Sequence, residues 1–142
     1  MKLLITSILL AIMLPAAAQE LMPFHSDGCS MFPDRMNVLG DWCSCCVDHD
    51  IAYWQGGTSA QKDSADQCLR ECVWSVTFSD ILSDAMYRGV QLGGNAFFPT
   101  WYRWGYGWNF GRGYDTLTVP QMDTVQRYLN LYFSENPENP CK

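Results

Sequence analysis

Seven cysteines constrain the fold of this 142-residue chain more than any other feature of its sequence. Two of them are adjacent in the segment SCCVDHDIAYW (residues 44–54), which also contains a histidine flanked by aspartates. Cysteines beside a histidine can bind a metal, can form a nucleophile with its base, or can brace a site through disulfides. The seven are Cys29, Cys43, Cys45, Cys46, Cys68, Cys72 and Cys141.

The first eighteen residues have the pattern of a secretory signal peptide. One positive charge at Lys2 precedes a largely apolar stretch from Leu3 to Leu14, and Ala16–Ala18 complete a cleavage site. We expect cleavage after Ala18 and a secreted or periplasmic protein that carries all seven cysteines. In an oxidising compartment these should form disulfides rather than a zinc site or a catalytic thiolate. Because seven is odd, at least one thiol is free or pairs between chains.

Residues 19–142 are enough for a single domain. The formal charge of the whole chain is -6 at pH 7, and it becomes -7 once Lys2 is removed. An acidic protein has no electrostatic reason to bind nucleic acid or an anionic membrane surface. Composition therefore argues against both classes of partner.

The middle of the chain predicts a pair of antiparallel helices. A helical stripe begins near Trp42, and Gly56–Gly57 ends this first helix. The segment Thr58–Gln61 is typical of a capping box at the start of a second helix. Because the turn between them is short, the two helices should pack side by side as a helical hairpin.

Two further helical stripes complete the prediction of a mainly α, disulfide-braced fold. One covers residues 81–90 and stops at Gly93–Gly94, and the other follows Pro120, a residue that favours the first turn of a helix. Residues 19–41 have little periodicity and are expected to be loop.

Residues 97–114 contain nine aromatic residues and four glycines without a helical or strand period. This aromatic loop could be a wall of the core, or it could meet a lipid–water interface, where tryptophan and tyrosine are favoured. Trp101, Trp104 and Trp108 are the candidate interface residues and could alternatively stack on sugars. Arg103 and Arg112 are placed to meet a phosphate.

One pair of residues in the helical hairpin could form a catalytic dyad. Tyr53 lies four residues after His49, so both project from one face of the first helix. On the second helix, Asp66 is the best candidate to oppose His49. With that pairing, Cys45 and Cys72 come to similar levels, because offsets of four and six residues correspond to about 6 and 9 Å along a helix. A disulfide between them would fix the register. Asp63 is a competing choice for the aspartate.

The segment CCVDHDIAY resembles the Cys-Cys-x-x-His-Asp-x-Cys-Tyr helix of the secreted phospholipase A2 family. The segment ADQCLREC resembles that family's partner helix, and DGCSMFPD lies about where the family has its calcium loop. The resemblance covers roughly residues 27–73, and nothing after residue 94 matches the animal enzymes. It implies a core of two antiparallel helices with a calcium-loop-like N-terminal segment, to which the aromatic loop is added.

The resemblance implies an acyl-ester hydrolase of phospholipids that acts at a membrane interface. His49 would be the general base that activates water, and Asp66 would orient its imidazole. Tyr53 would hold the aspartate in place.

The same resemblance implies a Ca²⁺ cofactor. Asp50 would supply carboxylate oxygens, and the backbone carbonyls of the loop would supply the rest. We expect these carbonyls to belong to Gly28, Ser30 and Phe32. A Cys29–Cys46 disulfide would join the loop to the helix.

The sequence departs from the family's pattern in its calcium loop and in one cysteine pair. The family's loop is rich in glycine, whereas this one contains Phe32 and Pro33, although Asp34 could add a second carboxylate. Ala52 and Ala65 stand where the family has two cysteines, as when a disulfide has been lost. A module with a weakened calcium loop that binds lipid, glycan or protein is therefore the alternative function. The pairing of Cys43, Cys68 and Cys141 stays open.

Overall fold

The computed structural model describes residues 20–137 and 140–141, so the expected signal peptide at residues 1–18 lies outside it. The described part is mainly helical, which confirms the expected class. It contains α1 (Cys43–Gln55), α2 (Ser59–Thr77), α3 (Asp80–Gly93), α4 (Val119–Glu135) and a small hairpin of β1 (Arg35–Met36) and β2 (Gly40–Asp41). The hairpin falls in the segment expected to be loop, and its antiparallel register pairs Arg35 with Asp41.

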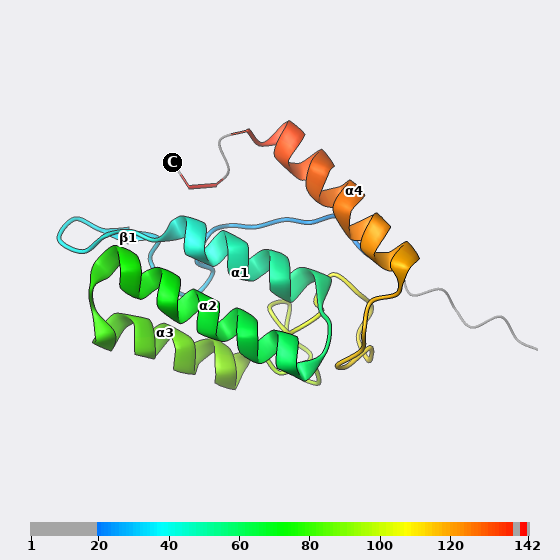
Figure 1. The fold of residues 1–142 in the computed structure, drawn as a ribbon, viewed down its shortest axis with the longest axis horizontal. Helices are drawn as coiled ribbons and strands as arrows, with labels where there is room; N and C mark the ends of the chain where they lie inside the picture. The colour runs from blue at the N-terminus through cyan, green and yellow to red at the C-terminus, as the bar shows by residue number, and fades with distance from the viewer. Residues whose placement is uncertain (1–19, 138–139, 142) are drawn as a thin grey trace, which may run out of the picture.

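Helix α2 lies between α1 and α3 and runs antiparallel to both (Figure 1). The N-terminus of α2 is fixed by the predicted capping box, in which Thr58 and Gln61 exchange hydrogen bonds. The helix ends at Phe78, whose left-handed backbone (φ 50°) prevents its continuation into α3. Ser79 then caps α3 through the amide of Leu82. The structure thus resolves the segment near Ser79 as a break between two helices.

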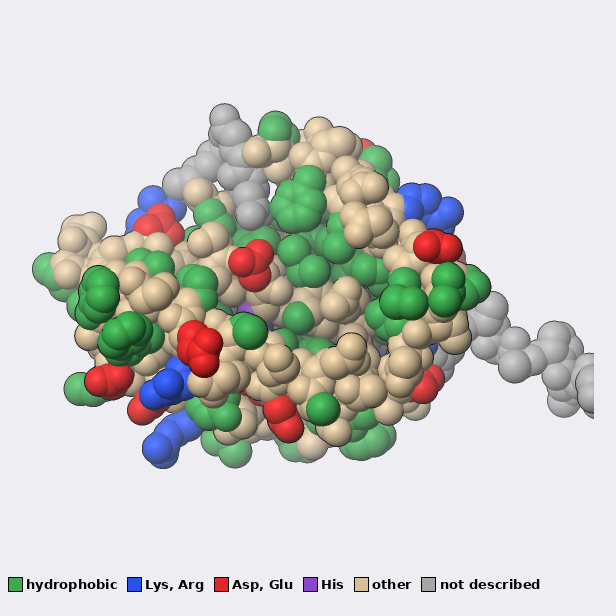
Figure 2. All heavy atoms as spheres, viewed as in Figure 1, with side chains coloured by type: hydrophobic (Ala, Val, Ile, Leu, Met, Phe, Trp, Pro, Cys, Tyr) green, Lys and Arg blue, Asp and Glu red, His purple; other side chains and the backbone are tan. Residues whose placement is uncertain are grey.

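Helix α4 lies on the opposite side of α1 from α2 (Figure 1). It packs through Val125 and Tyr132 onto a buried cluster that includes Phe24 and Trp54. Hydrophobic side chains fill the space between α1 and α4 (Figure 2). The Phe24 ring stands edge-on to Tyr132 at 4.7 Å, so the N-terminal segment lies between the two helices as part of the core.

All three disulfides start from the first four residues of α1. Cys45 bonds to Cys72 on α2, as the helical register predicted, and Cys46 bonds to Cys29 on the preceding loop, as the resemblance implied. Cys43 bonds to Cys141, a pairing that the sequence left open. Cys68 is exposed and has a free thiol. The start of α1 is therefore joined covalently to α2, to the loop and to the C-terminal tail.

Three disulfides in a chain of this size are typical of proteins from oxidising compartments. Within residues 20–137, none of the helices combines the length and the apolar character that crossing a membrane requires.

Removal of the longest cross-link should destabilise the fold. In the double variant Cys43→Ala/Cys141→Ala the unfolded chain regains the freedom that a bridge over 98 residues removes. We expect the free energy of unfolding to fall by about 2–5 kcal/mol, measured by urea denaturation without reductant. The free thiol supplies the control, because Cys68→Ala should change the same quantity by less than about 0.5 kcal/mol. Equal stability of the double variant and the control would contradict this expectation.

Candidate active site

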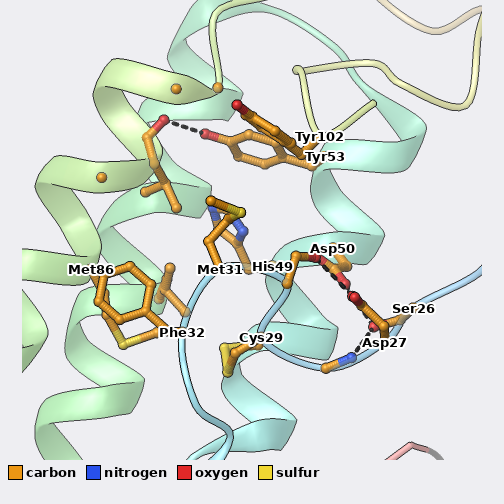
Figure 3. Close-up of a pocket in the computed structure, with 18 of the residues that line it drawn as sticks. Ser26, Asp27, Cys29, Met31, Phe32, His49, Asp50, Tyr53, Met86 and Tyr102 are labelled. Atoms are coloured by element: carbon orange, nitrogen blue, oxygen red, sulfur yellow. Dashed lines mark hydrogen bonds between the residues drawn. A yellow bond between two sulfur atoms is a disulfide. The ribbon is translucent and has the colours of Figure 1, made fainter. Parts of the chain in front are cut away.

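A cavity of about 700 Å³ lies between the N-terminal loop, α1, α3 and the aromatic loop. Its walls are largely apolar, and Leu69, Met86 and Val90 line the side formed by α2 and α3. His49 and Asp50 face it from α1, opposite the loop that carries Ser26 and Cys29 (Figure 3). The cavity therefore brings the two site residues on α1 together with an apolar chamber.

His49 and Asp66 form the expected pair across the α1–α2 interface. Nε2 of His49 lies 3.1 Å from Oδ1 of Asp66, and the two residues are 8 % and 0 % exposed. The hydroxyl of Tyr53 donates to the same carboxylate oxygen at 2.7 Å and lies 3.2 Å from the carbonyl of Val90 (Figure 3). The structure thus places Asp66, and not Asp63, against His49.

Asp66 has a third partner that the sequence did not point to. Lys62, one turn earlier on α2, is 5 % exposed and donates through Nζ to Oδ2 of Asp66 at 2.7 Å. Burial alone would raise the pKa of Asp66, but hydrogen bonds from His49, Lys62 and Tyr53, together with the Lys62 charge, lower it. The carboxylate is therefore ionised and accepts a hydrogen bond from each of its three neighbours.

The imidazole of His49 is consequently neutral at neutral pH, with its proton on Nε2. Burial lowers the pKa of His49; Asp66 opposes this shift, and the nearby Lys62 charge adds to it. Because the ionised carboxylate can only accept a hydrogen bond, Nε2 carries the proton that is donated to it and the lone pair lies on Nδ1. Burial also raises the pKa of Tyr53, so its phenol remains a hydrogen-bond donor. This tautomer is the one that a general base on α1 requires.

Asp50, the expected metal ligand, lies with Asp27 in an acidic corner of the cavity. The hydroxyl of Ser26 donates to its Oδ2 at 2.6 Å (Figure 3). Burial raises the pKa of Asp50 to about 7; the Ser26 hydrogen bond opposes the shift, and the negative charge of Asp27 adds to it. No ion pair joins Asp50 to a cationic side chain in the described part of the chain.

The loop that precedes α1 is held closed by Asp34. Its Oδ1 accepts the backbone N–H of Cys29 at 2.8 Å, so this carboxylate supports the loop from within. Gly28 has a φ of +84°, and a Cβ there would collide with the Asp34 carboxylate, so only glycine fits. Asp34 therefore has a structural role in the loop through Oδ1, and its expected role as a second metal carboxylate stays a prediction.

The other expected ligands of the loop are placed differently from one another. The Ser30 hydroxyl donates to Asp27 at 2.8 Å, close to the acidic corner. The Phe32 ring packs beside Met86, on the α3 side of the cavity and away from Asp50 (Figure 3). Across residues 20–137 and 140–141, no three His, Cys, Asp or Glu side chains converge as a metal-binding group. Oxygen donors from hydroxyls, backbone and water would have to complete any coordination shell.

The aromatic loop caps the C-terminus of α1. The amides of Gly105 and Gly107 donate to the carbonyls of Tyr53 and Trp54, and the Trp108 indole donates to the carbonyl of Gln55. These are carbonyls that a helix end leaves without partners inside the helix. The loop thus replaces solvent at the end of the helix that carries His49.

Three of the four residues expected at a substrate interface are instead buried in this cap. Trp104 and Trp108 are 2 % and 1 % exposed, and the Trp104 indole donates to the carbonyl of Gly57. Arg103 is also buried and donates to the carbonyls of Gly105 and Trp108, each at 2.6 Å. None of the three reaches the surface, so their assignment to an interface is wrong and their role is to shape the loop.

Trp101 is the member of that group that stays at the surface. It is 63 % exposed and lines the cavity, as does Tyr102 (Figure 3). Arg112, the other cation expected to meet phosphate, lies over the Trp108 ring at 4.3 Å and donates to Gln121. An interface at the cavity mouth would therefore use Trp101 and leave both arginines inside the loop.

Three residues of the site were missed by sequence reasoning, namely Lys62, Ser26 and Asp27. Lys62 carries a usable signal, because it lies four residues before Asp66 and so faces the same side of α2. Ser26 and Asp27 carry none, since they come from an irregular segment whose path depends on the tertiary fold.

No family model, curated protein or solved structure matches this chain.

The structural role of Arg103 predicts a loss of stability on conservative replacement. Lysine keeps the charge but cannot donate to two carbonyls with the fixed geometry of a guanidinium. We expect Arg103→Lys to lower the free energy of unfolding by about 1–3 kcal/mol in urea denaturation. Arg127→Lys, the same substitution at an exposed position, is the matched control and should leave the free energy of unfolding nearly unchanged. An unchanged stability combined with weaker lipid binding would instead restore Arg103 as an interface residue.

Proposed function

We propose that this protein is a calcium-dependent acyl-ester hydrolase of phospholipids, of the secreted phospholipase A2 type. One observation carries the proposal: a buried His49–Asp66 pair whose imidazole borders an apolar cavity of about 700 Å³. A neutral imidazole held by an ionised carboxylate is suited to take a proton from water. An apolar chamber beside it is suited to receive an acyl chain.

The residues of the chain would act on water directly. Nδ1 of His49 takes one proton from a water molecule as the water oxygen bonds to the ester carbonyl carbon. The tetrahedral intermediate then breaks its bond to the alcohol oxygen, which receives the proton from Nδ1. Asp66 holds the imidazole through Nε2 throughout and balances the charge of the imidazolium. No covalent bond forms between protein and substrate.

The donor set around Asp50 fits a hard cation such as Ca²⁺. Asp50 and Asp27 supply carboxylates, and Ser26 and Ser30 supply hydroxyls in contact with them. Calcium prefers six to eight oxygen ligands, and the expected carbonyls of the loop, those of Gly28, Ser30 and Phe32, would add to this set. When bound, the ion would supply positive charge for the ester carbonyl oxygen and the substrate phosphate.

The electrostatics of the acidic corner also favour the binding of a cation. A partly buried carboxylate with a second carboxylate nearby is stabilised when a positive charge joins the pair. Burial and the charge of Asp27 both disfavour the ionised form of Asp50. A bound divalent ion would instead favour the ionised form of Asp50.

Replacing the base tests the proposal directly. His49→Gln should lower the release of fatty acid from phospholipid–detergent micelles by about 10²–10⁴-fold, because water loses its proton acceptor. Excess chelator should suppress the activity of the wild type in the same assay. Asp48→Asn, an exposed change on the adjacent position of α1, is the matched control and should keep the activity.

The micelle assay, together with a measurement of liposome binding, separates the hydrolase from a binding module. Activity that is indifferent to both chelator and His49→Gln would refute the hydrolase. The exposure of Trp101 favours the module as the second candidate. Liposome binding that persists without hydrolysis and that Trp101→Ala abolishes would support the module.

The metal assignment makes its own prediction. Asp50→Asn removes one charge from the proposed ion site and should weaken Ca²⁺ binding by about tenfold or more in isothermal titration calorimetry. Asp63→Asn removes the same charge from an exposed position on α2 and should leave the affinity unchanged. Equal affinities of wild type and Asp50→Asn would show that calcium, if bound, lies elsewhere.

A further inference from the structure

Lys62 is a buried cation that takes no part in the proposed steps of ester hydrolysis. It is 5 % exposed, and no other lysine occurs in the described part of the chain. Burying an ammonium group is costly unless it is paired and hydrogen-bonded. Its Nζ meets that requirement with Oδ2 of Asp66 at 2.7 Å and lies 5.4 Å from the centre of the Tyr53 ring. Lys62 thus contacts two of the residues that surround His49.

We propose that Lys62 is a positioning residue of the His49–Asp66 pair. Its buried ammonium keeps Asp66 ionised with Oδ1 turned to His49, and so keeps the imidazole proton on Nε2 and the lone pair on Nδ1. The inference deepens the proposed hydrolase and rests on it for its functional meaning.

The two carboxylate oxygens of Asp66 have different hydrogen-bond partners, which supports this role. Oδ1 accepts from His49 and from Tyr53, whereas Oδ2 accepts from Lys62. The three donors come from two helices, and Lys62 provides the positive charge that balances the ionised carboxylate. With the imidazole neutral, the group of four side chains carries no net charge, which is the condition under which a buried ion pair is tolerated.

Loss of Lys62 would remove both the donor to Oδ2 and the balancing charge. A carboxylate with 0 % exposure and without a cation is stabilised by binding a proton. A protonated Asp66 would donate to Nε2, and the imidazole proton would then be on Nδ1. In that tautomer His49 cannot accept a proton from water, even though its position is unchanged.

The experiment compares the wild type with Lys62→Met, which keeps an unbranched side chain only one atom shorter and removes its charge. Long-range ¹H–¹⁵N spectra of protein labelled with ¹⁵N-histidine report which ring nitrogen carries the proton. We expect Nε2–H in the wild type and Nδ1–H in Lys62→Met at neutral pH. In micelle assays kcat should fall by about 10²-fold with little change in KM, because the base is lost and the cavity is not. Arg127→Met removes one positive charge from an exposed position and should change neither readout.

A wild-type tautomer and an unchanged kcat in Lys62→Met would overturn the proposal. If that variant does not fold, as judged by its near-UV circular dichroism, ¹⁵N-lysine spectra of the wild type decide the question. A slowly exchanging, hydrogen-bonded ammonium at Lys62 would support the proposal, and a rapidly exchanging one would overturn it; Lys142→Arg assigns the signal. The tautomer can be measured without turnover, so a wild type that lacks esterase activity would refute the hydrolase separately.

Discussion

The site depends on one buried negative charge, the carboxylate of Asp66. A carboxylate without solvent exposure is tolerated only when hydrogen bonds and a positive charge compensate for lost hydration. Here α1 provides two donors, His49 and Tyr53, and α2 provides Lys62. The pairing of the two helices is therefore set by electrostatics as well as by packing, because a shift of one turn would separate the charge from its partners.

Disulfides from the two adjacent cysteines of α1 hold the helix in that register. Neighbouring residues on a helix project about 100° apart, so Cys45 and Cys46 cannot face the same segment. Cys45 bonds to α2, which carries Asp66, and Cys46 bonds to the loop beside the acidic corner. The aromatic loop closes the other end of α1 by donating to its last carbonyls. Helix α1 is thus fixed at both ends, and the side chains in its middle carry the proposed chemistry.

The sequence predicted those parts of the site that depend on local periodicity. His49 and Tyr53 share a face because they are four residues apart, and the positions of Asp66 and Cys72 follow from a short turn between two helices. The pairing of Cys29 with Cys46 came from a resemblance, because nothing in the spacing of a loop fixes it.

Contacts between distant segments escaped prediction for a physical reason. A run rich in tryptophan suits a surface and a core equally well until the neighbouring segment is known. The buried indoles donate to carbonyls of distant residues, Trp108 to Gln55 at the end of α1 and Trp104 to Gly57 in the turn that follows it. Arg103 likewise donates to carbonyls within the loop. Ser26 likewise meets Asp50 only through the path of the N-terminal segment around the helix.

The bridge between Cys43 and Cys141 also sets an order on maturation. Its second cysteine follows α4 along the chain, so this bond cannot close until α4 has been synthesised. The other two bridges lie within residues 29–72 and can form on a nascent chain that has not yet produced α4. The helical pair that holds His49 and Asp66 can therefore be cross-linked first, whereas the Cys43–Cys141 bond can close only after α4 has been made.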